Sequence, residues 1–106
     1  MAGYLLIESR DPFESNDVAY YYELARSLAA AGNQVTVLLV QNGVLAARAA
    51  AQAPGLSALS GAGVKVLADE FALKERGITK LRDGVAATAI DVVVDRLEAG
   101  DKTLWH

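Results

Sequence analysis

The sequence contains no cysteine, which excludes disulfides, thiolate metal sites and thiol nucleophiles on this chain. The redox compartment therefore cannot be inferred from disulfide usage. The segment leading to Glu8 lacks the basic start and long apolar core of a signal peptide, so we expect a cytoplasmic protein. No apolar run reaches the roughly 20 residues that cross a bilayer, so we expect no membrane association.

An excess of positive charge is also missing. The net charge is -3 and the isoelectric point is near 5.0, so nothing attracts the chain to nucleic acid or anionic lipid. No nucleotide-binding motif is present, because Gly61-Ala62-Gly63 precedes a predicted strand and lacks a third glycine. We identify no catalytic residue, no metal site and no cofactor, and we assign no role to the single histidine, His106.

Apolar residues, in contrast, are abundant. They make up 53% of the 106 residues, against 22% charged residues. The length suits one domain, residues 1–106, without a second independent core. A chain this small leaves much apolar surface exposed as a monomer, so we expect it to self-associate.

Apolar runs alternate with segments of helical spacing along the chain. The predicted strands are Tyr4–Ile7, Val35–Val40 and Val64–Ala68, with a brief fourth strand over Gly84–Ala86 and an edge strand over Thr103–Trp105. The predicted helices begin near Asn16, continue from Asn42-Gly43 to about Ala53, cover Phe71–Arg76, and include Ile90 to Leu97. Gly55 to Gly63 is expected to be a loop that holds at most one helical turn.

Strands that alternate with helices in this way predict a three-layer α/β sandwich. We expect a mainly parallel sheet of four to five strands with right-handed crossovers, and a flavodoxin-like order is the leading topology. In such sheets, ligands bind beyond the carboxyl ends of the strands.

Polar residues follow each of the first three predicted strands, so they should share one rim. The candidate pocket residues are Asp11, Asn42, Asp69 and Glu70. One interpretation is a polar pocket in which Asn42, Asp69 and Glu70 converge. The alternative is local backbone work, in which Asp11 and Asn42 serve turns while Asp69 and Glu70 cap the next helix.

Three consecutive tyrosines, Tyr20 to Tyr22, fall on the first predicted helix, so at least one must point away from the core. We name Tyr20, Tyr22 and Trp105 as interface candidates, because exposed amphipathic aromatic rings suit subunit contacts. Tyr21 fits the apolar face, and a core position explains it more simply. Trp105 either packs on the edge of its own sheet or anchors a neighbouring subunit.

Several segments in the same order resemble the DsrE/DsrF family of small sulfur-relay proteins. The Gln-Asn-Gly-Val turn and the Leu-Lys-Glu-Arg-Gly-Ile segment are the most specific of them. The segments are Ser9–Asp17 (SRDPFESND), Val35–Val44 (VTVLLVQNGV), Gly63–Ile78 (GVKVLADEFALKERGI) and Gly84-Val85.

The resemblance implies a flavodoxin-like sheet, assembly into trimers or hexamers, and traffic of sulfane sulfur between carrier proteins. Members that handle sulfur directly hold a cysteine at the end of the third strand, and Asp69 stands at the matching position here. Aspartate cannot form a persulfide, which argues against an enzymatic role. The resemblance therefore implies an accessory homo-oligomer, or a hetero-oligomer with a cysteine-bearing paralogue, and a sulfur-carrier protein as a further partner.

Two other functions remain open. The first is a small-ligand-binding module, unrelated to sulfur, that uses the rim of Asn42, Asp69 and Glu70. The second is a phosphoacceptor receiver domain with Asp69 as acceptor and Asp11 near a magnesium ion. Receiver domains place paired carboxylates directly after the first strand and a lysine after the last, whereas this sequence has Glu8-Ser9-Arg10 and Trp105-His106.

Overall fold

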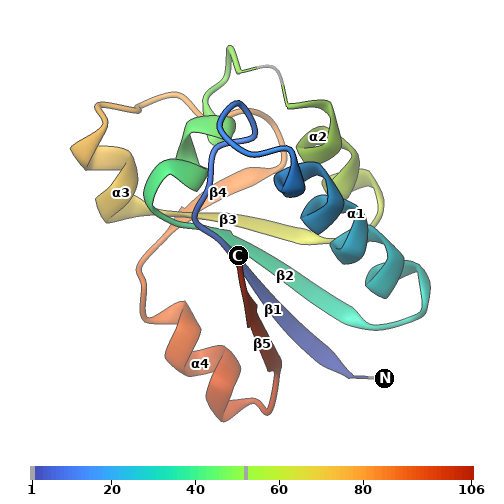
Figure 1. Ribbon diagram of the computed structural model, residues 1–106. Helices are drawn as coiled ribbons and strands as arrows, with labels where there is room; N and C mark the ends of the chain where they lie inside the picture. The colour runs from blue at the N-terminus through green and yellow to red at the C-terminus, as the bar shows by residue number, and fades with distance from the viewer. Residues whose placement is uncertain (1, 52) are drawn as a thin grey trace.

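The computed structural model describes residues 2–51 and 53–106, which form a five-stranded sheet flanked by helices (Figure 1). Every pair of neighbouring strands is parallel. The strands are β1 (Gly3–Glu8), β2 (Gln34–Leu39), β3 (Lys65–Asp69), β4 (Val85–Thr88) and β5 (Lys102–Trp105), in the spatial order β4-β3-β2-β1-β5. The predicted α/β class with a parallel sheet of four to five strands is confirmed.

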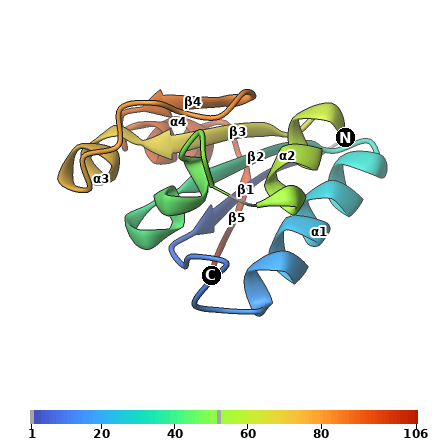
Figure 2. The same ribbon diagram turned by 90° about the horizontal axis from the view of Figure 1, so that it is seen from above.

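The helices divide unequally between the two faces of this sheet. They are α1 (Asp17–Ala30), the 3₁₀ helix η1 (Gln41–Ala47), α2 (Pro54–Gly61), α3 (Glu70–Glu75) and α4 (Val92–Glu98). Figure 2 shows α1 and α2 together on one side of the sheet. The larger core lies between the sheet and these helices and includes Leu6, Val37, Leu56 and Leu59.

The opposite face of the sheet carries a smaller core. It consists of Leu5, Ile7, Leu38, Val40 and Leu67, against which Val92 and Val93 of α4 pack. Helix α4 has no buried residue of its own. The three-layer sandwich is therefore complete, but one outer layer is thin.

Crossover handedness explains this asymmetry. The chain advances from β1 to β4 in one direction across the sheet, then returns to place β5 on the free side of β1. Because crossovers are right-handed, a reversed direction puts the connecting helix α4 on the opposite face. The strand order therefore differs from the flavodoxin order 2-1-3-4-5, since here β2, β3 and β4 all lie on one side of β1.

The middle of the chain differs from the prediction. We predicted a helix from Asn42-Gly43 to about Ala53 and a loop after it, whereas the structure has a 3₁₀ helix up to Ala47 and a helix over Pro54–Gly61. Residue 52 of the predicted helix lies outside the described residues. Arg48 is extended and bridges Leu81, and Ala49 N donates to Lys80 O at 3.1 Å. These long-range bonds end the helix, and proline at a first helical turn favours the later start.

The turn after β2 requires a glycine. A Cβ on Gly43 would lie 2.2 Å from the Glu8 carbonyl oxygen, so the backbone of this turn can approach β1 only without a side chain. Gly43 therefore fixes how closely the turns after β1 and β2 meet.

None of the helices in the described ranges is long and apolar enough to cross a bilayer.

The three tyrosines of α1 point to different environments. Tyr20 is 76% exposed, whereas Tyr22 is 4% exposed and belongs to the larger core. The interface assignment of Tyr22 is thus corrected, because the fold of a single chain already buries its ring. Tyr21 is half-buried, and its hydroxyl donates to the Leu104 carbonyl at 2.9 Å. Burial, and secondarily the nearby Glu8 carboxylate, raise the pKa of both Tyr21 and Tyr22.

The Tyr22 hydroxyl is buried without a hydrogen-bond partner among the described residues. Such a group costs about 1–3 kcal/mol, so Tyr22→Phe should raise the free energy of unfolding by about 1 kcal/mol in urea titrations. Tyr21→Phe is the matched control. It removes a satisfied hydrogen bond and should lower the free energy of unfolding by about 0.5–1.5 kcal/mol.

The stability gap between Tyr22→Phe and the native chain should widen above pH about 10, where an unfolded tyrosine ionises. A raised folded pKa means that stability is present below the unfolded pKa and is lost as pH rises above it. The phenylalanine variant lacks this loss at position 22. A destabilised Tyr22→Phe variant would contradict the assignment of an unsatisfied hydroxyl.

Candidate functional site

The carboxyl ends of β1, β2, β3 and β5 surround an open groove on the α4 side of the sheet. The groove has a volume of about 600 Å³. Its apolar walls include Ile7, Val40, Phe71, Ile90, Val94 and Trp105, and its polar residues are Gln41, Asp69, Glu75 and Asp91. We call this space the groove.

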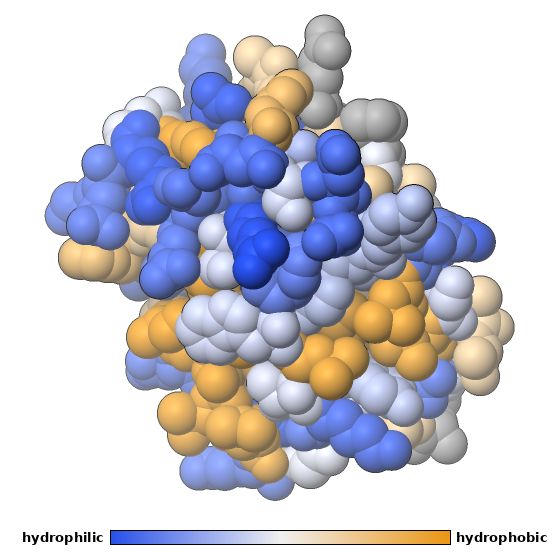
Figure 3. Space-filling view, in the orientation of Figure 1, coloured by the Kyte–Doolittle hydropathy of each residue, from blue (hydrophilic) through white to orange (hydrophobic). Residues whose placement is uncertain are grey.

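The groove exists because α4 covers its sheet face incompletely. Four of the large apolar side chains at the walls stay more than half exposed: Phe71 and Trp105 at 66%, Val94 at 55% and Ile90 at 51%. Figure 3 shows hydrophobic residues gathered over α4 at the lower left. Exposed apolar patches that are hollowed in this way mark binding sites more often than random surface does.

Asp69 is the last residue of β3 and the N-cap of α3. Its Oδ2 accepts a hydrogen bond from Ala72 N at 3.3 Å, and the side chain is only 8% exposed. The capping bond holds the carboxylate at the end of the strand, where it lines the groove. Asp69 thus caps the next helix, as one of the two interpretations predicted, and it also lines the groove.

The other predicted pocket residues do not join Asp69. Asn42 Oδ1 accepts hydrogen bonds from the Arg76 guanidinium at 2.9 and 3.3 Å, and its Nδ2 donates to Glu14 at 3.2 Å. Asn42 therefore ties the turns after β1 and β2 to the end of α3. Glu70 faces away from the groove and lines a separate hollow of about 320 Å³.

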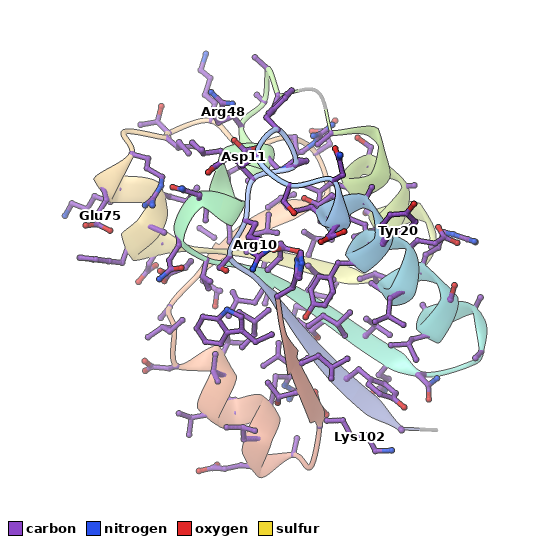
Figure 4. All side chains as sticks on the ribbon, viewed as in Figure 1. Arg10, Asp11, Tyr20, Arg48, Glu75 and Lys102 are labelled. Atoms are coloured by element: carbon purple, nitrogen blue, oxygen red, sulfur yellow. The ribbon has the colours of Figure 1, made fainter. Side chains whose placement is uncertain are left out.

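Asp11 also stabilises its own turn through hydrogen bonds to nearby backbone groups. Its Oδ1 accepts a hydrogen bond from Phe13 N at 3.1 Å, and its carbonyl accepts from Glu14 N and Ser15 N. Figure 4 labels it in the turn after β1, near the top of the view. Asp11 is not among the residues that line the groove. The structure thus brings Asp69 alone, of the four candidates, to the groove.

Sequence reasoning missed a buried polar contact next to the groove. Glu8, at the end of β1, is fully buried, and its two carboxylate oxygens lie 2.8 and 3.1 Å from His106 Nδ1. Glu8 also accepts a bond from Arg10 N at 2.9 Å. The two residues are 98 positions apart, so no local sequence pattern could have joined them.

This contact helps to place Trp105 at the wall of the groove. Ser9 Oγ donates to the His106 carbonyl at 2.9 Å and lies 3.4 Å from Trp105 Nε1. The Tyr21 ring stacks near His106 with ring centroids 5.2 Å apart. Trp105, which we named as an interface candidate, therefore forms part of the groove and packs beside Ile7 of β1.

The lining of the groove suits recognition of a ligand. Within the described residues, no three histidine, aspartate or glutamate side chains are grouped closely enough to hold a metal ion. The chain has no thiol, and the polar lining consists of one amide and three carboxylates. The arrangement is thus an apolar, aromatic and acidic binding surface at the carboxyl edge of a parallel sheet.

Comparisons with solved structures agree with the fold. A protein of unknown function, MTH1491, from Methanobacterium thermoautotrophicum superimposes with a TM-score of 0.88 at 20% identity, with all of both chains covered. The ychN protein from E. coli gives 0.86 at 20% identity, also with full coverage of both chains. BT1422 from Bacteroides thetaiotaomicron gives 0.72 at 14% identity, covering 96% of this chain and 93% of that one.

Comparison with curated proteins yields no match. The model of the DsrE/DsrF-like family matches residues 3–105, which is nearly the whole chain. The match includes all five strands and the groove around Asp69. On this evidence, the chain belongs to the DsrE/DsrF-like family.

Proposed function

We propose that this chain is an accessory member of its family. It works in the cytoplasm within an oligomer associated with sulfur transfer, and it carries no persulfide itself. The observation that carries the proposal is Asp69 at the end of β3. The sequence resemblance aligns this position with the cysteine of members that handle sulfur directly.

The environment of Asp69 supports a non-carrier role. A persulfide needs a thiolate that attacks the sulfane sulfur of a donor, and a carboxylate cannot do this. The side chain instead caps α3 by accepting a hydrogen bond from Ala72 N. Aspartate can therefore stand where other members have cysteine while the local fold is kept. The chain keeps the family architecture while losing the reactive group.

Exposed apolar residues on α1 support assembly. Tyr20 is 76% exposed and Leu24 is 40% exposed, and their four-residue spacing puts them on one face of the helix. We call these two residues the α1 stripe. The stripe is on the opposite side of the sheet from the groove, so subunits can meet there while the groove remains open.

A small-ligand-binding role unrelated to sulfur is the second candidate. The groove volume of about 600 Å³ is typical of ligand sites, which span about 300–1,000 Å³. The rim proposed from the sequence is not needed for this role, since Asn42 and Glu70 are directed elsewhere. Sulfur-uptake and ligand-binding measurements on the same protein distinguish the two functions.

Sulfur uptake tests the non-carrier proposal directly. The purified chain, incubated with glutathione persulfide, should show no added sulfur by intact-mass spectrometry, because it has no thiolate. Asp69→Cys should gain one sulfur atom that a thiol reductant removes. In that reaction the introduced thiolate attacks the sulfane sulfur, the donor S–S bond breaks, and glutathione leaves as its thiolate.

Asp69→Ser is the matched control, because serine also caps helices but offers no thiol. Sulfur bound to the native chain, or to Asp69→Ser, would refute the non-carrier proposal. An Asp69→Cys variant that stays folded but unreactive would show that this groove is unsuited to sulfur chemistry.

Light scattering at micromolar concentration tests assembly. The mass should exceed that of one chain, either alone or after addition of a cysteine-bearing member of the family. Burial of a large apolar side chain contributes about 1.5–3 kcal/mol, so Tyr20→Glu should weaken association at least about tenfold.

Ala19→Glu provides a control on the same helix, since it adds the same charge about 100° away around the helix axis. It should leave the mass unchanged. Assembly through the α1 stripe would be excluded if the native chain stayed monomeric both alone and with a cysteine-bearing member of the family added. Equal effects of the two substitutions on the mass would also exclude it.

A further inference from the structure

The groove presents aromatic rings to solvent in the absence of any covering segment among the described residues. Phe71 of α3 and Trp105 of β5 both line it, and both are 66% exposed. Trp105 is held by its contact with Ser9. Exposed aromatic rings offer a large apolar contact area to the body of a ligand, and their negative faces tolerate a nearby cation better than an anion.

The charge of the groove also favours a positively charged ligand. Asp69, Glu75 and Asp91 line it, and no lysine, arginine or histidine is among its lining residues. Glu75, labelled on α3 in Figure 4, lies 3.8 Å from the Arg76 guanidinium, which partly balances its charge. Within residues 2–51 and 53–106, the ion pairs include neither Asp69 nor Asp91.

Asp69 is the best placed of these carboxylates to bind a ligand. It is only 8% exposed, and the cap bond to Ala72 N uses only Oδ2. Oδ1 is therefore left for a ligand in the groove. A carboxylate that has lost most of its water interacts more strongly with a cation than a surface carboxylate does, because the local dielectric constant is lower.

We propose that the groove binds an organic cation, an ammonium group attached to an aromatic or branched aliphatic body. The ammonium group would contact Asp69 Oδ1, and the apolar body would lie against Val40, Phe71, Val94 and Trp105. This site does not depend on the proposed sulfur-related role. It gives the second candidate function a defined ligand class.

Other ligand classes fit this surface less well. An anion meets three carboxylates and no cationic side chain, so the local field repels it. A neutral apolar molecule would fill the groove but displace water from Asp69 without replacing its hydrogen bonds. A cation with an apolar body satisfies both the carboxylate and the walls.

The single tryptophan makes the test direct, because all indole emission reports on the groove. The native chain should be titrated with 2-phenylethylammonium, 2-phenylethanol and 3-phenylpropionate, which share a phenyl group and differ in charge. The cation should change the emission saturably. It should bind at least about tenfold more tightly than the alcohol, which corresponds to about 1.4 kcal/mol, and the anion should not bind.

Asp69→Asn isolates the charge, because asparagine caps helices about as well as aspartate does. The variant should keep its thermal midpoint near that of the native chain and bind 2-phenylethylammonium at least about tenfold more weakly. Glu70→Gln is the control, since Glu70 lies in the separate hollow. It should leave the affinity unchanged.

Equal affinity for the cation and the alcohol would overturn the proposal, as would a stable Asp69→Asn variant that binds the cation normally. A protein that responds to none of the three probes would also overturn it. In that case, Trp105 emission that shifts on dilution to monomer would identify a second copy of the chain as the occupant of the groove. None of these outcomes changes the expected result of the sulfur-uptake experiment.

Discussion

The return of the chain from β4 to β5 is the constraint on which the rest of the structure depends. Three right-handed crossovers place their helices on one face, and the reversed crossover must place α4 on the other. A seven-residue helix cannot cover five strands. The exposed walls of the groove, the small second core and the position of Trp105 all follow from this one geometric requirement.

Asp69 connects the family architecture to what is particular to this chain. Its place at the end of a parallel strand is where such sheets bind ligands, and its cap bond is ordinary local chemistry. A carboxylate at this position offers ionic and hydrogen-bonding contacts and no nucleophilic sulfur, and it still meets the backbone requirement for a capping residue.

Sequence reasoning predicted the parts of the fold that depend on local pattern. The strand before α1 contains a continuous apolar run, and the strand after α1 is rich in apolar and β-branched residues. The end of β3 could be located because the polar pair Asp69-Glu70 closes its apolar run. The early end of the helix at Ala47 could not be predicted, because it depends on backbone hydrogen bonds to residues 80–82, far along the chain. The pairing of Glu8 with His106 was likewise invisible, since it requires knowing that β5 lies beside β1. The groove needed both the strand order and the length of α4.

The position of β5 has a consequence for how the molecule acquires its shape. β1 to β4 are joined by short-range crossovers and can form a partial sheet early, whereas β5 must close a loop of nearly the whole chain to reach β1, with Glu8 and His106 98 residues apart. Docking of β5 therefore carries the largest loop-closure entropy of any strand pairing in the sheet. A sheet without β5 would leave Ile7 and the edge of β1 uncovered, and such an open hydrophobic edge can pair with other chains.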